Sequence, residues 1–444
     1  MFASNLFFGA AEAASGLAGS AAGSTHMWIG VAIFAAAYLF IASEKVDKTI
    51  AAMLGAGLMI ALGVAGFNDM LGKIDLNVLG LLIGMMMFVA VVKHSGMFEY
   101  LAVKSAKVAK GDPWKMMIFF IIITAVLSGL LDNVTTVLLV GPMTFAITKE
   151  MDLNPVPYIM TQILASNIGG TGTLIGDPPN IMIGSATGLT FGDFLVNDGL
   201  IVIVVLAATI AAFYFIYGKK LNATPEAMAK VMAMDEKSLI RDKKLLIKSI
   251  VMIVLIVAGF MLHSVLHMES SIVALSGAVI MMIIGRQNVE EVVSDVEWPT
   301  IIFFTALFIV VGGMVETGVI DKLADLIMGV TGGKPVMTMM IILWVSAILS
   351  STLDNIPFVA TMIPLITAMG NDGMDVMPLW WALSLGACLG GNGTLIGASA
   401  NVVGIATAAK SGHMIKWGKY CKAMAPATIL VVLVSMLMIY ARYL

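Results

Sequence analysis

The chain has 444 residues, of which 59% are hydrophobic and 12% are charged, and its formal net charge at pH 7 is −3. A soluble domain of this length would need far more charge to cover its surface, and the mean hydropathy is +0.99. The composition therefore excludes a soluble globular protein.

The first 27 residues are rich in Ala, Gly and Ser and contain no Lys or Arg. Because a signal peptide begins with a positively charged segment, we interpret residues 1–27 as a retained extracytoplasmic tail. From there on, apolar runs recur whose length suits a hydrocarbon layer of about 30 Å, which indicates an all-α, polytopic membrane protein. The runs are Trp28–Ser43, Thr49–Phe67, Leu76–Val92, Phe194–Tyr217, Ser249–His263, Ser270–Gly285, Pro299–Val315 and the shorter Pro426–Tyr440.

The two halves of the chain repeat each other. A shift of 222 positions, half of the length, places Leu-Asp-Asn at 131–133 on Leu-Asp-Asn at 353–355. One position out of step, Gly-Gly-Thr-Gly-Thr-Leu-Ile-Gly at 169–176 falls on Gly-Gly-Asn-Gly-Thr-Leu-Ile-Gly at 390–397. Matches that stay in register over both halves indicate an internal duplication.

Each repeat is predicted to contain about five transmembrane helices, one of them broken, and one re-entrant helical hairpin. The predicted boundaries are repeat 1 at 28–217 (hairpin 116–148, broken helix 156–187), a cytoplasmic linker at 218–248 with a short amphipathic helix, and repeat 2 at 249–444 (hairpin 336–368, broken helix 378–409).

The distribution of Lys and Arg predicts the orientation of these segments. If the hairpins return on the same side and both termini are extracytoplasmic, all but four of the 25 basic residues are cytoplasmic. The four outside are Lys73, Lys322, Lys334 and Arg442. Five crossings per repeat is an odd number, so the second repeat is expected to enter the membrane inverted, as in many secondary transporters.

An Asp-Asn pair interrupts each hairpin. Asp132 and Asn133 lie within 116–148, and Asp354 and Asn355 lie within 336–368. A carboxylate at membrane depth costs about 2.5 to 3.5 kcal/mol on insertion scales, so it is normally buried in protein and functional. We therefore interpret both pairs as hairpin tips that line a site, in preference to plain solvated loops.

A glycine-rich segment interrupts the next apolar stretch of each repeat. It runs from Ser166 to Asn180 in the first half and from Ala387 to Asn401 in the second. Four glycines cannot hold a straight helix, and Pro178 and Pro179 remove two backbone donors. The pattern predicts a discontinuous helix whose unwound carbonyls and half-helix ends face a substrate or ion.

The halves differ at these interruptions, because Asp177 is replaced by Ala398. An ion site is therefore expected in the first half, which has more oxygen ligands. Asp132, Asp177 and Asp354 have no membrane-embedded Lys or Arg beside them in the sequence, and such buried carboxylates bind protons near neutral pH. We take these three as candidates for proton coupling.

Together, these two motifs resemble the arsenite-permease and sodium–proton-antiporter branch (ArsB/NhaD permeases) of the ion transporter superfamily. The resemblance implies paired hairpin tips and broken helices around a central site. Dicarboxylate-carrying relatives have Ser-Asn-Thr at the tips, and here Asp replaces Ser, which disfavours a dianionic substrate. The implied function is secondary active efflux of arsenite or antimonite, as the neutral trihydroxide, driven by proton exchange through alternating access.

The expected ligands are amide, hydroxyl and carboxylate side chains with backbone carbonyls; direct ligation of arsenic by the Cys388 thiol competes with a plain packing role. No catalytic residue, cofactor or metal site is expected. The predicted binding residues are Asp132, Asn133, Thr135, Asn167, Gly169, Gly170, Thr171, Thr173, Asp177, Asn180, Asp354, Asn355, Cys388, Gly390, Gly391, Asn392, Thr394 and Asn401.

Several alternatives remain open. Sodium–proton exchange is the second choice, because Asp132, Asp177 and Thr135 offer hard oxygen ligands. An intramembrane enzyme lacks its motifs here, such as His-Glu-x-x-His, and a channel would not explain duplicated polar breaks. The expected partners are arsenite, antimonite, H⁺ or Na⁺ and the lipid of the cell inner membrane, with no nucleic acid. The resemblance adds a homodimer and a soluble ATPase as partners that this sequence does not specify.

Overall fold

The computed structural model describes residues 26–43, 45–64 and 66–444. The predicted tail at 1–27 lies outside these ranges except for His26 and Met27, which begin a helix that ends at Ser43. Every regular element in the described ranges is helical, as the sequence predicted.

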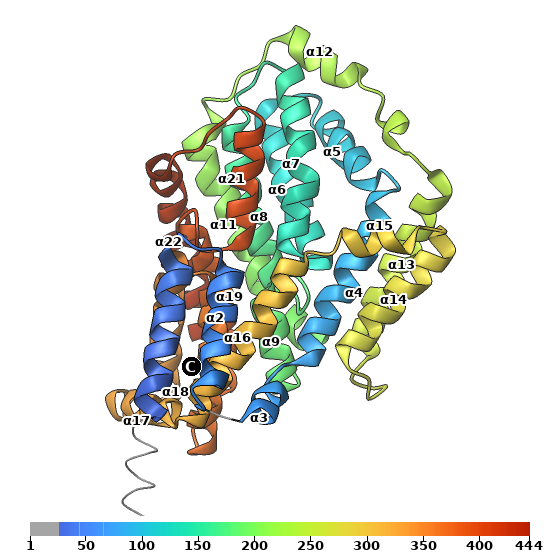
Figure 1. Cartoon of the computed structure of the whole chain (residues 1–444). Coiled ribbons are helices and arrows are strands. Elements are labelled where there is room, and N and C mark those ends of the chain that lie inside the picture. Colours follow the sequence, from blue (N-terminus) through green and yellow to red (C-terminus); the bar gives the residue numbers. More distant parts are fainter. Residues whose placement is uncertain (1–25, 44, 65) are drawn as a thin grey trace, which may run out of the picture. The chain divides into compact units, whose positions relative to one another are not determined.

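The remaining helices follow in chain order (Figure 1). They are α2 (Lys48–Ala61), α3 (Phe67–Gly72), α4 (Leu76–Lys93), α5 (Met97–Val108), α6 (Pro113–Leu130), α7 (Asn133–Glu150), α8 (Val156–Thr171), α9 (Pro178–Thr187), α10 (Phe191–Phe194), η1 (Leu195–Gly199), α11 (Leu200–Phe213), η2 (Tyr214–Gly218), α12 (Pro225–Ala233), η3 (Glu236–Leu239), α13 (Lys243–Leu262), α14 (Ser270–Gly285), α15 (Val289–Ser294), α16 (Trp298–Glu316), α17 (Val319–Thr331), α18 (Pro335–Thr352), α19 (Asn355–Asn371), α20 (Met377–Gly390), η4 (Gly391–Gly393), α21 (Ser399–Lys410) and α22 (Trp417–Tyr443).

Eight helices in the described ranges are long and apolar enough to cross a membrane. They are His26–Ser43, Leu76–Lys93, Pro113–Leu130, Phe191–Gly218, Lys243–Leu262, Trp298–Glu316, Pro335–Thr352 and Trp417–Tyr443, and two shorter apolar helices are Lys48–Ala61 and Ser270–Gly285. The last helix is longer than the predicted run at 426–440, because its polar first turns lower the hydropathy without ending the helix. The chain is a multi-pass membrane protein.

The chain forms two compact units. Unit 1 contains the described residues up to Asp75 together with Pro299–Gly333 and Pro364–Met374. Within it, α2 lies against α16: Thr49 Oγ1 donates to the carbonyl of Pro299 at 3.2 Å, and the Lys48 ammonium lies 5.0 Å from the centre of the Phe303 ring. Unit 1 thus joins a helix of the first half to a helix of the second.

Unit 2 contains Leu76–Trp298, Lys334–Ile363 and Asp375–Leu444. Its closest helix pairs are α4 with α14, α6 with α8 and α18 with α20. Glycines allow two of these approaches: a Cβ at Gly169 would overlap the backbone of Ala125, and one at Gly390 would overlap the backbone of Ala347. The same close crossing therefore occurs once in each half of the sequence.

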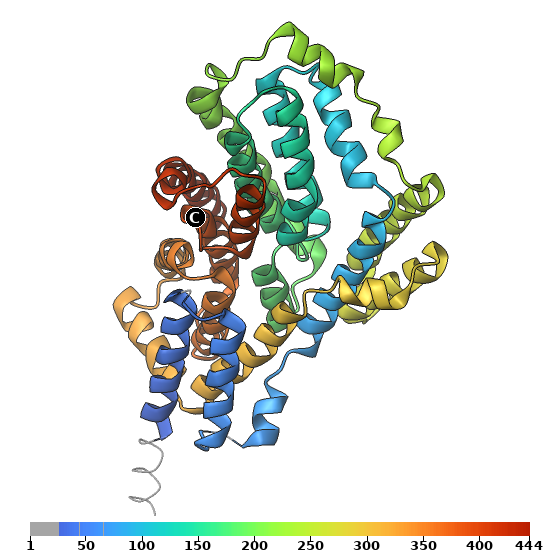
Figure 2. The ribbon, with the colours of Figure 1, turned by 45° about the horizontal axis from the view of Figure 1, so that its top comes forward.

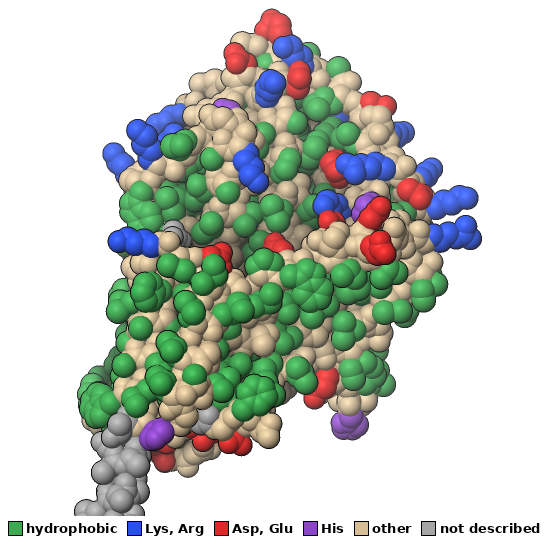
Figure 3. All heavy atoms as spheres, in the orientation of Figure 1, with side chains coloured by type: hydrophobic (Ala, Val, Ile, Leu, Met, Phe, Trp, Pro, Cys, Tyr) green, Lys and Arg blue, Asp and Glu red, His purple; other side chains and the backbone are tan. Residues whose placement is uncertain are grey.

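The linker between the halves belongs to unit 2 (Figure 2), and ion pairs attach it to α5. The Lys107 ammonium on α5 pairs with Glu236 at 2.6 Å, and Arg241 pairs with Glu99 at 2.9 Å. Figure 3 shows Lys and Arg side chains gathered around this end of the unit. It is the end that the sequence predicts to be cytoplasmic, and the orientation itself stays a prediction. The helix after the linker begins at Lys243, earlier than the predicted 249, because Asp242 caps it.

Both predicted interruptions coincide with helix ends. The hairpin at 116–148 divides into α6 and α7 around Leu131 and Asp132, and the stretch at 156–187 divides into α8 and α9. In the second half, α18 and α19 meet at Leu353 and Asp354, and the break after η4 precedes α21. Whether the hairpins return on one side, and whether the repeats are inverted, stay predictions.

Candidate substrate site

The two hairpin tips are helix caps. Asp132 is the N-cap of α7, and its Oδ1 accepts a hydrogen bond from the Thr135 backbone N–H at 2.8 Å. Asp354 Oδ1 likewise accepts from the Ile356 backbone at 3.1 Å, and its Oδ2 accepts from the Ser399 hydroxyl at 3.3 Å. Asp is a preferred N-cap because it satisfies amides that have no partner within the helix. The caps explain why both tips carry Asp.

In the first broken helix, one side chain ties the unwound segment together. The Asn180 amide group donates to the carbonyls of Thr171 and Thr173, both at 2.9 Å. Thr171 ends α8, and Asn180 lies in the first turn of α9. Asn180 therefore supplies donors to carbonyls that the break leaves without helical partners.

The second broken helix repeats this arrangement. The Asn401 amide group donates to the carbonyls of Gly391 at 2.7 Å and Thr394 at 2.8 Å. Further contacts are also matched: the Ser128 hydroxyl donates to the Ser166 carbonyl, and the Ser350 hydroxyl donates to the Ala387 carbonyl, both at 2.6 Å. The two breaks thus share one backbone design, as a duplication predicts.

A line of buried amides joins the two breaks. Asn133 Nδ2 donates to Asn167 Oδ1 at 3.1 Å, and Asn167 Nδ2 donates to the side-chain oxygens of Asn392 at 2.8 Å and Asn401 at 2.9 Å. All four side chains are at most 2% exposed. The first hairpin tip, the first broken helix and the second broken helix therefore meet at Asn167.

Asp177 lies in the first break and contacts the second hairpin tip. Its Oδ1 accepts a hydrogen bond from Asn355 Nδ2 at 3.3 Å. Its Oδ2 and the side-chain oxygen of Asn133 are buried and have no hydrogen-bond partner among the described residues. None of the ion pairs found among those residues includes Asp132 or Asp177. Within the described ranges, the site therefore offers acceptor oxygens without a cation paired to them.

The predicted residues thus fall into four groups. Asn133, Asn167, Asp177, Asn180, Asn355, Asn392, Asn401 and Cys388 contribute side chains to a connected, buried cluster. Asp132 and Asp354 cap helices, and Thr135, Thr171, Thr173, Gly391 and Thr394 take part through backbone atoms. Gly169, Gly170 and Gly390 make the close backbone approaches.

Two residues of this cluster escaped the sequence reasoning. The Ser384 hydroxyl on α20 lies 2.7 Å from Asn180 Oδ1 and 2.5 Å from Asp198 Oδ2. Asp198 is fully buried in η1, inside the apolar run Phe194–Tyr217. The signal was present, because a carboxylate within an apolar run is the feature that singled out Asp132.

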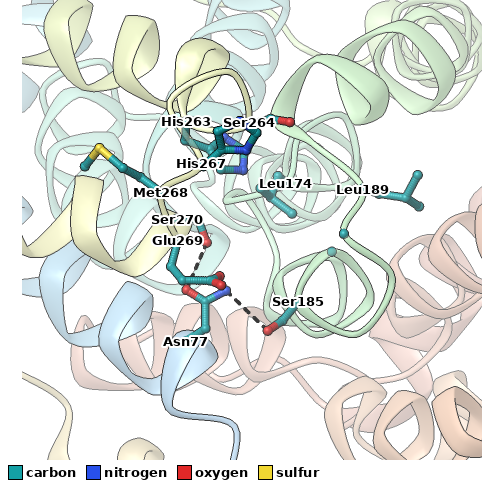
Figure 4. A pocket seen from close by; sticks show the side chains of 12 residues that line it. Asn77, Leu174, Ser185, Leu189, His263, Ser264, His267, Met268, Glu269 and Ser270 are labelled. Carbon is teal, nitrogen blue, oxygen red and sulfur yellow. Dashed lines mark hydrogen bonds between the residues drawn. The ribbon is translucent and has the colours of Figure 1, made fainter.

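A separate cavity of about 330 Å³ opens beside the first broken helix. Figure 4 shows Asn77 on α4 hydrogen-bonded to Ser185 and Ser270 in its wall. His263 and His267 line it after the end of α13. None of the predicted binding residues lines this cavity.

Sequence comparison connects the chain with transporters. The family model described as "Citrate transporter" (CitMHS) matches residues 38–386. An uncharacterized transporter of Mycobacterium tuberculosis is 42% identical over 423 residues, which are 94% of this chain and 98% of the relative. The human P protein is 32% identical over 474 residues, covering 88% of this chain and 57% of the P protein.

Structural comparison supports the same fold class. The crystal structure of the YdaH transporter of Alcanivorax borkumensis, described as having an unusual topology, superposes with a TM-score of 0.56 at 13% identity. The match covers 84% of this chain and 87% of that one. These comparisons support a transporter of the wider ion transporter group, while membership of the ArsB/NhaD branch stays a prediction.

Proposed function

We propose, from the premise that this chain belongs to the citrate transporter (CitMHS) family, that it carries a neutral hydroxylated solute in exchange for protons. Arsenous and antimonous acid are the test solutes. The proposed binding site is the buried cluster around Asn167, and the proposed direction is efflux. The chain is a membrane transporter and not an enzyme.

One observation carries the choice of solute: the site presents hydrogen-bond acceptors without a cation. Asp177 Oδ2 and Asn133 Oδ1 are buried without a partner among the described residues. A buried acceptor without a partner costs about 1 to 3 kcal/mol, so a ligand that donates hydrogen bonds would gain by binding there. A trihydroxide carries three O–H donors and no charge, which suits this pair.

The same observation counts against a free carboxylate cargo, although the family description names citrate. Citrate carries several negative charges at neutral pH. It would approach Asp177, which forms no ion pair within the described ranges. Like charges at low dielectric repel strongly, so we expect free citrate to be excluded unless bound protons or a metal ion neutralise it.

A second candidate is sodium–proton exchange. Carboxylate and amide oxygens are hard ligands that suit a small cation, and Asp177 and Asn133 supply one of each. This candidate predicts that Na⁺ and H⁺ compete for Asp177 and that no solute is needed for proton movement.

Transport by the purified full-length protein in proteoliposomes tests these proposals. An imposed pH gradient is combined in turn with arsenite, antimonite, Na⁺ and citrate, and proton movement is followed with a pH-sensitive dye. We expect arsenite and antimonite to move in exchange for protons, in the direction opposite to the proton flux, and citrate to remain outside.

Two outcomes would contradict the leading candidate. Sodium-dependent proton flux without arsenite movement would favour the second candidate and contradict the first. Uptake of free citrate would contradict the electrostatic argument and with it both candidates. Liposomes containing an Asn167→Ala variant are the control for solute that crosses without the site.

A further inference from the structure

Asp198 is a buried acid outside the predicted site. It is the fourth residue of η1, within the helix Phe191–Gly218 that is long enough to span a membrane, and its side chain is fully buried. Its Oδ1 has no hydrogen-bond partner among the described residues. Intramembrane carboxylates are normally functional, and π-helical turns occur frequently at functional sites.

The contacts of Ser384 constrain the protonation of this acid. Ser384 Oγ lies 2.5 Å from Asp198 Oδ2 and 2.7 Å from Asn180 Oδ1. Both neighbours accept hydrogen bonds when Asp198 is ionised, but a hydroxyl carries a single proton to donate. Both short contacts can be hydrogen bonds at once only if Asp198 itself carries a proton and donates it to Ser384 Oγ.

We propose that Asp198 is a proton-binding site whose state Ser384 transmits to Asn180. With the proton bound, Asp198 donates to Ser384 and Ser384 donates to Asn180. When the proton leaves to water, the Ser384 hydroxyl turns to the carboxylate, and among the described residues Asn180 Oδ1 keeps the Cys388 thiol at 3.5 Å as its remaining donor. A thiol is a weak donor, so Asn180 is held less firmly in the ionised state.

The consequence reaches the first broken helix. Asn180 is the residue whose amide group holds the carbonyls of Thr171 and Thr173 together. Loss of the proton from Asp198 therefore weakens the hydrogen-bonded bridge that Asn180 forms across the unwound segment. The link from this switch to transport rests on the proposed function, whereas the proton-binding site and its coupling to Asn180 do not.

The titratable groups around Asp198 are few. Asp193 on α10 accepts hydrogen bonds from the backbone and hydroxyl of Thr190. Cys388 on α20 and Arg442 and Tyr443 on α22 interact with Asp198 electrostatically. None of them forms an ion pair with Asp198 within the described ranges, so the Ser384 hydrogen bond is its direct polar contact.

This relay occurs in only one half of the molecule. At the offset that aligns the two glycine-rich breaks, Ser384 corresponds to Ile163, which has no hydroxyl. The second break therefore has the hydrogen bonds of Asn401 to its own carbonyls without a hydroxyl equivalent to that of Ser384.

Infrared difference spectroscopy of the full-length protein in lipid vesicles, titrated with pH and without added solute, tests this proposal. We expect wild type to lose a protonated-carboxyl band as the pH rises, together with a shift in a side-chain amide band. Asp198→Asn should lack that carboxyl band. Ser384→Ala should keep it at a shifted frequency, because its hydrogen bond is lost, and should lose the coupled amide shift.

Two results would overturn the proposal. One is a carboxyl band that Asp198→Asn leaves unchanged, and the other is an amide shift that Ser384→Ala leaves unchanged. If Asp198→Asn fails to fold, the Ser384→Ala variant alone tests the proposal. Its carboxyl band is predicted to shift, and its amide band is predicted to stop responding to pH. Asp193→Asn is the matched control, a nearby carboxyl whose removal should leave both bands in place. Failure of arsenite transport with these bands intact would contradict the proposed function alone.

Discussion

The two broken helices have the same backbone design and different side-chain chemistry. Asn180 and Asn401 each bridge two carbonyls of their own break. The Asn167 amide contacts Asn401, whereas at the equivalent place the Cys388 thiol contacts Asn180. Asp177 in the first break is replaced by Ala398 in the second.

The difference indicates a division of labour. Hydrogen bonds that hold the backbone occur in both halves, so both are needed to keep a broken helix folded inside protein. The acids Asp177 and Asp198 occur only on the first-half side of the alignment, so proton handling is expected to be concentrated there. The predictions below test that asymmetry, from the largest expected effect to the smallest.

Replacement of Asp177 by Asn should have the largest effect. The variant removes the carboxylate whose Oδ2 is left for a proton or ligand, so we expect proton-coupled transport to fall by about 100-fold, equivalent to about 2.7 kcal/mol. Proton flux in proteoliposomes measures this. Ala398→Ser, at the equivalent position, removes no carboxylate, so proton-coupled transport should stay within about threefold of wild type. Equal loss in both variants would contradict the asymmetry.

Replacement of the crossing glycines should affect both halves alike. Gly169→Ala and Gly390→Ala each place a Cβ against the backbone of the neighbouring helix, and such overpacking costs about 1 to 3 kcal/mol. Thermal unfolding in detergent should show a lower Tm for both. Gly418→Ala is the control, because a Cβ there meets nothing within 4 Å. A loss of Tm in only one half would show that the scaffold is not shared.

Asn167 and Cys388 occupy equivalent positions in the two breaks, and their replacement by Ser should lower the stability of the protein to different degrees. Asn167→Ser removes an amide that bonds Asn133, Asn392 and Asn401, and we expect about 1 to 3 kcal/mol of destabilisation. Cys388→Ser keeps a donor to Asn180, so its Tm should change less.

Arsenite transport by Cys388→Ser answers a further question. Retained transport would indicate that the thiol packs and donates without binding arsenic. Abolished transport with unchanged Tm would instead favour direct ligation, the alternative that the sequence left open.

The smallest effect is expected in the linker. The hydrogen bond from Lys107 is the main cause that lowers the pKa of Glu236 to about 2, below its ordinary 4.5. Since the folded pKa is depressed, the contribution to stability is present above the ordinary value and is lost only as the pH falls through about 2. Glu236→Gln should therefore leave the pH profile of transport between about pH 5 and 8 unchanged. A shifted profile would place pH sensing in the linker.

The sequence predicted much of the architecture because membrane segments follow simple rules. Hydropathy located the spans, and Gly, Pro and Asp marked the breaks at 172–177 and 131–132. The sequence could not show which side chains form the site, because Asn133 and Asn401 are far apart in the chain and are connected through hydrogen bonds to Asn167. Asp198 was overlooked because it lies near the start of a long apolar run and its partner Ser384 belongs to the other half.

By itself, the sequence determined the helical class, the duplication and the polar breaks, since these depend on local composition and on spacing along the chain. Tertiary structure alone decided that Asp132 and Asp354 cap helices, while Asp177 and Asp198 enter a buried network. The physical reason is that a carboxylate's role depends on which donors reach it. Those donors come from helices more than 170 positions away in the chain, Asn355 for Asp177 and Ser384 for Asp198.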